Sequence, residues 1–395
     1  MQKRWPTIIF LWLIGVLAAA QLAKFSSIAP LLRDRFDLSL PEAGLLISLL
    51  EVGGGLFGFV AGMALGWINY RRSLLAGVAI LAATSLLEAS AASSTMLFAA
   101  RAVEGIGYLL VVIAAPTAIA AIADDRNRAR ALALWSSFVP VGIAVGSGVT
   151  SLGVASLGAN GIMVLWAAVL AVTIVPLLRL HLRTGDNDSR RVVLPAPAAW
   201  VSTFAFGVYT LFLCALTMLL PTFLMAERAA ALNEAGLVAS VASLSALPAS
   251  GLAILLIRRG QLSTGRLLMI AIPALVGTAL LVPLALARSS DLATTSILVV
   301  GAVLLSGLVS PLMFARLPIL AGAESPHDPR IATANGLLTQ FGAGGALIGP
   351  PLGGLVADEW GWTALGAVIA GLALLMLAGV ALSEWIAARS SPIGA

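Results

Sequence analysis

Charged side chains are rare within the apolar stretches of this sequence, and the ones that lie well inside such stretches include Lys24, Glu51, Arg101 and Glu104. A charge near the centre of a membrane helix costs about 3 kcal/mol, so each is expected to face a cavity or a charged partner. Arg101, Glu104 and Tyr108 are spaced for one face of a helix, and Gln21 shares a face with Lys24. If these stretches are membrane helices, the four charges lie within about one helical turn of a common depth. We therefore predict one buried network that joins three helices and borders a central cavity.

Buried carboxyl groups can carry protons, and buried cations can hold an anionic group. Glu51 and Glu104 are the predicted proton-coupling residues. Lys24, Arg101, Gln21 and Tyr108 are the predicted substrate-binding residues. Glu51 has no basic neighbour on its own helix, whereas Glu104 has Arg101 one turn away, so Glu51 is the expected proton carrier. The alternative is that a network whose charges sum to zero only holds the helices together.

The elements that position these residues are apolar segments of membrane length. The chain of 395 residues is 60% hydrophobic and 10% charged, with a mean hydropathy of +1.02, and about 20 apolar residues cross a bilayer as a helix. This composition indicates an all-α integral membrane protein with many spans. The expected spans are 7–31, 42–67, 73–91, 96–122, 131–156, 161–179, 198–224, 234–257, 265–286, 293–321, 332–357 and 363–386.

The distribution of Lys and Arg predicts the orientation. Most of those outside the spans fall on the side of both termini, and the ones expected on the opposite side are Arg33, Arg35, Arg228 and Arg288. The positive-inside rule places both termini in the cytoplasm, with the protein in the cell (inner) membrane. The same rule explains the pI of about 10.1 without a nucleic-acid partner. We read the apolar run behind the basic start as a retained first helix.

The chain is predicted to consist of two similar halves. The sequence LPEAGLLISL from Leu40 recurs as LNEAGLVASV from Leu232, 192 residues later, and Pro30 and Gly15 have counterparts at Pro221 and Gly207. The polar segment from His181 onwards separates them. The predicted domains are an N-terminal six-helix bundle (1–180), a central cytoplasmic loop (181–197) and a C-terminal six-helix bundle (198–395). A repeat in one orientation implies a two-fold axis along the membrane normal, with the substrate site between the halves.

Polar residues of the second half could orient a substrate by hydrogen bonds, although they could equally bind neighbouring helices. The predicted binding residues there are Tyr209, Asn335, Thr339 and Gln340. Arg316 adds positive charge toward the cytoplasmic side, or extends its side chain to the membrane surface. Cys214 is the single cysteine, so neither an intrachain disulfide nor a cysteine metal site is expected. We predict no metal and no cofactor.

Three motifs resemble those of the major facilitator superfamily (MFS) of secondary transporters. RAVEGIG matches the family's Arg-x-x-x-Gly-x-Gly of helix 4, and GMALGWINYRR partly matches its loop between helices 2 and 3, with Gly66 and Trp67 in place of Asp-Arg. GALIGPPLGG carries the antiporter glycine motif, here on helix 11 instead of helix 5, where Ser147 replaces the proline. The resemblance implies the twelve-helix MFS fold and alternating access. The gating or structural residues that it implies are Gly62, Arg71, Arg72, Gly105, Gly107, Gly345, Gly349, Pro350, Gly353 and Gly354.

The predicted function is proton-coupled transport of a small organic, anionic solute by a monomer in the lipid bilayer. The alternative is a drug or metabolite/proton antiporter of the same family, which the glycine motif favours. A metal or cofactor importer, suggested by Met218 and Met225, lacks histidine ligands within the spans. An intramembrane enzyme would need a motif such as HExxH or GxSxG, which the sequence lacks, so we predict no enzymatic activity.

Overall fold

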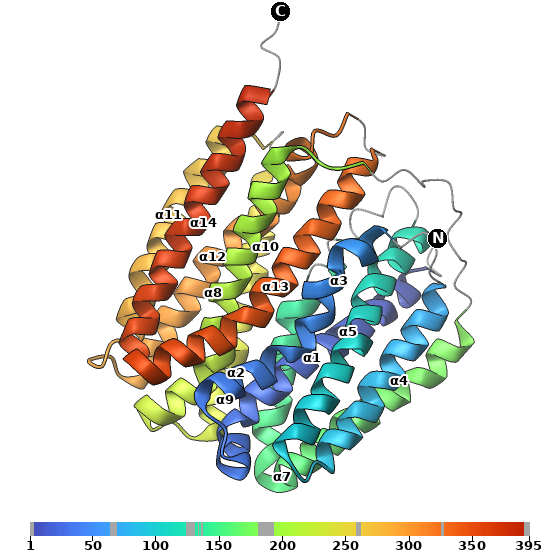
Figure 1. Ribbon diagram of the computed structural model, residues 1–395, viewed down its shortest axis with the longest axis vertical. Coiled ribbons are helices and arrows are strands. Elements are labelled where there is room, and N and C mark those ends of the chain that lie inside the picture. The colour runs from blue at the N-terminus through green and yellow to red at the C-terminus, as the bar shows by residue number, and fades with distance from the viewer. Residues whose placement is uncertain are drawn as a thin grey trace, which may run out of the picture.

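The computed structural model of the chain describes residues 4–63, 69–123, 131–132, 134–135, 137–180, 193–257, 262–324 and 328–390. Within these ranges the regular structure is helical throughout (Figure 1). The helices of the first half are α1 (Trp5–Phe36), α2 (Leu40–Ser48), the 3₁₀ turn η1 (Leu49–Glu51), α3 (Val52–Met63), α4 (Tyr70–Ala89), α5 (Ser94–Ile122) and α7 (Phe138–Arg179). Those of the second half are α8 (Pro197–Arg228), α9 (Leu232–Leu244), α10 (Ala246–Ile257), α11 (Thr264–Ala285), α12 (Leu292–Leu320), α13 (Pro329–Trp360) and α14 (Trp362–Ser390).

Among the described residues, nine helices are long and apolar enough to cross a membrane. One of them, α7, contains a sharp bend at Gly158, where φ is 67°. Because a positive φ suits glycine and interrupts a helix, α7 corresponds to the two expected spans 131–156 and 161–179. The interrupted segment α2–η1–α3 is one of the nine, and α9–α10 and α13 account for the remaining expected spans. The total of twelve membrane crossings stays a prediction.

The chain repeats the same local structures 192 residues apart. Asp37 and Ala229 both adopt the left-handed backbone conformation, with φ of 52° and 51°, directly after α1 and α8. Close to these turns, Arg35 donates to the carbonyl of Ala91 in the loop between α4 and α5. In the same way, Arg228 donates to the carbonyl of Ala287 in the loop between α11 and α12. These positions are the loops expected outside, and we call this end of the molecule the outer end. The repeat seen in the sequence is therefore present in the structure.

The contacts between the halves follow the same two-fold relation. Ser48 of α2 donates to the carbonyl of Leu347 in α13 at 2.7 Å, and Ser240 of α9 donates to that of Ala144 in α7 at 3.0 Å. Ser48 and Ser240 are separated by the repeat length, so the two bonds are equivalent. In Figure 1, α2 and α3 lie beside α13 where the amino-terminal and carboxy-terminal helices meet. The division at residues 181–197 stays a prediction, because residues 181–192 lie outside the described part of the chain.

The glycine motif of α13 serves close helix packing. A Cβ at Gly345 or Gly349 would collide with backbone carbonyls of α8, and one at Gly353 would lie 3.1 Å from the Cβ of Ala215. Gly354 faces α2 of the other half, because its Cβ would lie 2.6 Å from the carbonyl oxygen of Leu40, the first residue of α2. Small residues allow such backbone approach. The motif therefore allows α13 to pack closely against α8 of its own half and against α2 of the other half.

The other motif residues also have structural contacts. The Arg71 guanidinium donates to the carbonyl of Leu178 at the end of α7, and the Arg72 backbone N–H donates to the Asn69 side chain at 3.1 Å. A Cβ at Gly107 would lie 2.8 Å from a carbonyl of α4. Gly62 belongs to α3, whereas Gly66 and Trp67 lie outside the described residues. The contacts of Arg71 and Gly107 join α4 to α7 and α5, and that of Arg72 caps the start of α4.

Replacing Gly44 by valine is expected to separate α2 from α13 at the outer end. A Cβ at Gly44 would overlap the carbonyl of Pro350, and overpacking of this kind costs about 1–3 kcal/mol. The spacing can be measured between spin labels on cysteines placed at Leu45 and Glu359 in a Cys214→Ser background. Gly344→Val is the matched control, because a Cβ at Gly344 meets no heavy atom of the described chain within 4 Å. An unchanged label distance in Gly44→Val would contradict this packing.

Candidate functional site

Lys24 lies at the centre of a buried cluster formed by α1, α4 and α5. Its Nζ donates to Ser85 Oγ at 2.9 Å, Glu88 Oε2 at 2.6 Å and Glu104 Oε1 at 3.1 Å. The side chains of Lys24, Glu88 and Glu104 are completely shielded from solvent. An ammonium group has three N–H donors, so the three acceptors use all of them. The hydroxyl of the same Ser85 donates to Oε1 of Gln21, one turn before Lys24, at 3.5 Å.

Arg101 connects this cluster to helix α2. Its Nη1 pairs with Glu104, while Nε donates to the carbonyl of Leu46 at 3.0 Å and Nη2 to that of Ile47 at 2.8 Å. The guanidinium also lies 4.5 Å from the ring centre of Phe25, a distance suited to a cation–π contact. Glu104 is thus held by Lys24 on one oxygen and by Arg101 on the other.

The carbonyls that Arg101 binds are available because the second membrane segment, α2–η1–α3 (helix 2), is interrupted there. α2 ends at Ser48, and the turn Leu49–Glu51 is 3₁₀ before α3 begins at Val52. A change from α to 3₁₀ hydrogen bonding leaves carbonyls of the preceding turn without their usual partner. Gly105 allows the approach, because a Cβ there would lie 2.9 Å from the carbonyl oxygen of Leu50. Arg101 therefore fixes the interruption that positions Glu51.

Glu51 lies outside the ion-pair network, at the contact between the halves. It forms no ion pair with any basic side chain among the described residues, and the Tyr108 hydroxyl lies beside its carboxyl. The Cys214 thiol of α8 lies near it, and a Cβ on Gly54 would lie 3.6 Å from Glu51 Oε2. Glu51 is 8% exposed, whereas Lys24, Arg101 and Glu104 are 0% exposed. It is thus the least enclosed of these four charges.

The structure brings together most of the predicted residues of the first half and adds one that the sequence did not single out. Lys24, Arg101 and Glu104 form a connected network as expected. Glu88, at the end of α4, takes the place in the ion pairs that we expected for Glu51. Ser85 lies three residues before Glu88 and on the same face of α4. This pair of polar residues was the sequence signal that could have predicted a buried polar face on α4.

The predicted polar residues of the second half do not join the cluster. Tyr209 is buried on α8, and its hydroxyl is directed toward Ser306 of α12. Gln340 accepts from the backbone N–H of Phe59 at 3.1 Å across the contact between the halves. Asn335 is exposed, and its carbonyl accepts from the Thr339 hydroxyl at 3.0 Å. Their role in substrate binding stays a prediction.

A second buried ion pair lies in the other half. Arg316 of α12 donates from Nε to Glu384 Oε1 of α14 at 2.8 Å, from Nη1 to the carbonyl of Leu262 at 2.9 Å and from Nη2 to Thr264 Oγ1 at 3.2 Å. Its donors are therefore used within the protein, and Arg316 does not extend to the membrane surface. The pair joins α12 and α14 to the start of α11.

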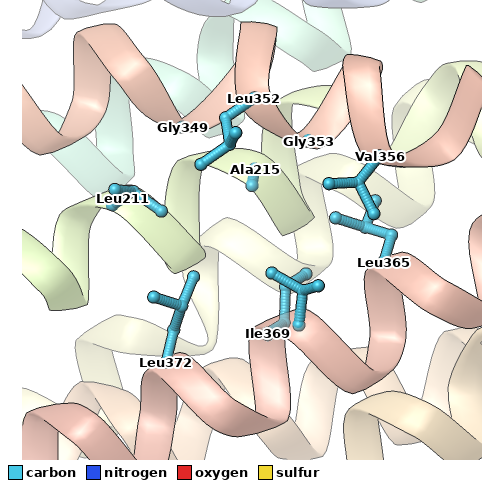
Figure 2. Close-up of a pocket in the computed structure, with 10 residues that line it drawn as sticks. Leu211, Ala215, Gly349, Leu352, Gly353, Val356, Leu365, Ile369 and Leu372 are labelled. Carbon is cyan, nitrogen blue, oxygen red and sulfur yellow. The ribbon is translucent and has the colours of Figure 1, made fainter. Parts of the chain in front are cut away.

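The pocket shown in Figure 2 lies apart from the charged cluster. Leucine, isoleucine, valine, alanine and glycine residues of α8, α13 and α14 line it, among them Leu211, Gly349 and Leu372. It offers no charged side chain, and it borders the glycine motif described above. The central cavity that we expected beside Lys24 stays a prediction.

Comparison with known proteins gives a family match and structures of similar fold. The sequence model of the Major Facilitator Superfamily matches residues 11–325. The chain is similar in structure to a bacterial homologue of the human lysosomal transporter Spinster in an inward-facing and occupied conformation, with a TM-score of 0.73 and 19% identity over 99% of this chain and 98% of that one. The inward-facing and unoccupied form of such a homologue gives a TM-score of 0.68 at 18% identity over 98% and 97%. No curated protein sequence matches the chain.

Proposed function

Because the chain belongs to the major facilitator superfamily, whose members carry small molecules across the bilayer by alternating access, we propose that it is a proton-coupled secondary transporter of a small organic solute. The observation that carries the proposal is the position of Glu51. This carboxyl lies at the contact between the halves, without an ion-pair partner in the described part of the chain. A buried acid in such a place can bind and release a proton as the halves move.

The interruption of helix 2 supports this role. Glu51 is the last residue of η1, and the glycines Gly53, Gly54 and Gly55 follow it. A 3₁₀ turn inside a membrane helix is a common site of local movement. Since Arg101 holds the carbonyls before the turn, movement of α5 relative to α2 is expected to change the surroundings of Glu51.

We propose an anionic solute as the first candidate. Lys24 and Arg101 are the buried cations of the first half in the described part of the chain, but every donor of Lys24 is already bonded. An anion must therefore displace Glu88 or Glu104 from Lys24, and protonation of a glutamate would make this possible because a neutral acid binds the ammonium less strongly. Substrate binding and proton binding would then occur together.

The exposure of Glu51 favours a second candidate, the exchange of a cationic or neutral solute for protons. Of the buried charges of the first half among the described residues, the carboxylate of Glu51, not a cation, has the largest exposed fraction. Tyr108 adds an aromatic ring close to it. A cation could replace the proton at Glu51, which would give an antiporter.

A dye assay in proteoliposomes tests the proposal and separates the two candidates. Vesicles that contain the full chain and an internal pH-sensitive dye are challenged with a panel of monocarboxylates, dicarboxylates and hydrophobic amines. Entry of a carboxylate with protons acidifies the lumen more than in empty vesicles, whereas exchange of an amine for protons raises the internal pH. A panel member that is taken up, as a radiolabelled solute, with no change in internal pH and no response to a protonophore would refute proton coupling.

A further inference from the structure

The buried charges of the first half do not balance if all of them are ionised. Among the described residues this buried set consists of two cations, Lys24 and Arg101, and three acids, Glu51, Glu88 and Glu104. One negative charge is therefore in excess in a region where uncompensated charge is costly. A single bound proton makes the set neutral.

The hydrogen bonds show which acid can hold that proton. Both oxygens of Glu104 accept from cations, Oε1 from Lys24 and Oε2 from Arg101. The Tyr108 hydroxyl lies beside Glu51, and a neighbouring O–H donor suits an ionised carboxylate. Glu88 uses only Oε2, which pairs with Lys24, and its buried Oε1 has no hydrogen-bond partner.

The neighbours of Glu88 support this assignment. Lys24 of α1, which Glu88 shares with Glu104, is its ion-pair partner, and Arg101 of α5 lies within electrostatic range. The Glu104 carboxyl lies beside it, so ionisation of both acids brings two negative charges together. Ser85 on its own helix already accepts from Lys24.

We propose that Glu88 is a second proton-binding site, which in this conformation holds the one proton of the buried cluster while Glu51 is ionised. The proton occupies the carboxyl oxygen that lacks a partner, and the cluster is then neutral. This extends the proposed function and rests on it in one respect: during transport the proton is exchanged between Glu88, at the end of α4, and Glu51, at the contact between the halves. The charge of the cluster stays constant while the acid that is neutral changes.

Infrared spectroscopy of the purified full chain in detergent at neutral pH tests the assignment without a substrate. Exposed carboxyls are ionised at this pH, so the C=O stretching band of a neutral carboxylic acid reports buried protons. We expect one such band in the wild type and its loss in Glu88→Gln. Glu88→Asp is expected to shift the band, because the proton then resides on a different acid, whereas Glu51→Asp leaves its position unchanged. Glu384→Gln, which removes the buried acid of the other half, leaves it in place.

Three outcomes would overturn the assignment. The band is absent from the wild type, it persists in a folded Glu88→Gln variant, or it shifts with Glu51→Asp and not with Glu88→Asp. Because Glu88→Asp keeps the carboxyl, it also answers the question if Glu88→Gln fails to fold. The spectrum does not depend on transport, so a band on Glu88 together with uptake that ignores the proton gradient would refute the proposed function and leave the site standing.

Discussion

Replacing Lys24 by methionine is expected to lower the free energy of unfolding by about 3–5 kcal/mol, the usual result of removing one partner of a buried ion pair. Methionine fills a similar volume, so the loss is mainly electrostatic. Lys24 binds Ser85, Glu88 and Glu104 at once, and its side chain is fully buried. Without it, the adjacent carboxyls of Glu88 and Glu104 lose the cation between them. Denaturant unfolding in mixed micelles measures the change.

Two further variants show whether the loss is due to the buried acids. Arg288→Met removes an exposed cation and is expected to change stability by no more than about 0.5 kcal/mol. Combining Lys24→Met with Glu104→Gln removes one ionised acid together with the cation, so the double variant should be more stable than Lys24→Met alone. If Lys24→Met and Arg288→Met lose equal stability, the cluster is not an important source of stability.

The sequence was sufficient to predict the family and the architecture because both depend on long-range composition. Apolar length, basic loops and the repeat from Leu40 to Leu232 each extend over many residues. The structure contains the repeat in its details, such as the equivalent bonds of Ser48 and Ser240. Membership of the superfamily follows from the match over residues 11–325.

Glu88 could not be identified from the sequence as a partner of Lys24. The depth of each charge in the membrane was counted from the expected ends of its helix. The first helix continues to Phe36, five residues beyond the expected end at Leu31, and Lys24 therefore lies farther from that end than we assumed. Glu88 is the last residue but one of α4, which suggested a position near the membrane surface. Helices differ in length and tilt, so equal distance from their ends does not mean equal depth.

That Glu51 lies outside the ion pairs could not be predicted for a different reason. It results from the 3₁₀ turn in helix 2, which depends on contacts with Arg101 and Gly105 of another helix. No local pattern specifies such contacts, although the glycine run after Glu51 indicated that other backbones come close. Arg316 is a similar case, since its partner Glu384 lies 68 residues away on the last helix.

The last prediction concerns the coupling of transport to protons. Glu51→Gln is expected to abolish proton-driven accumulation of the solute that the dye assay identifies, while exchange of labelled for unlabelled solute across the vesicle membrane continues. Glutamine has the shape of a protonated glutamate and can still accept from Tyr108, but it cannot release a proton. The buried charges of the remaining cluster then balance with Glu88 ionised, so that the cluster holds no proton to exchange.

Accumulation and exchange are measured in the same vesicles, with and without an imposed pH gradient. Glu359→Gln, a change at an exposed acid of α13, should leave both rates as in the wild type. Loss of exchange as well as accumulation would show that Glu51 is needed for binding or for movement of the halves, because these steps do not require net proton transfer. Undiminished accumulation against the gradient in Glu51→Gln would exclude Glu51 as the carrier. Glu104 and Glu88 would then be the remaining acids to vary, and a variant of Glu88 that alone abolished accumulation would place the whole proton cycle at the end of α4.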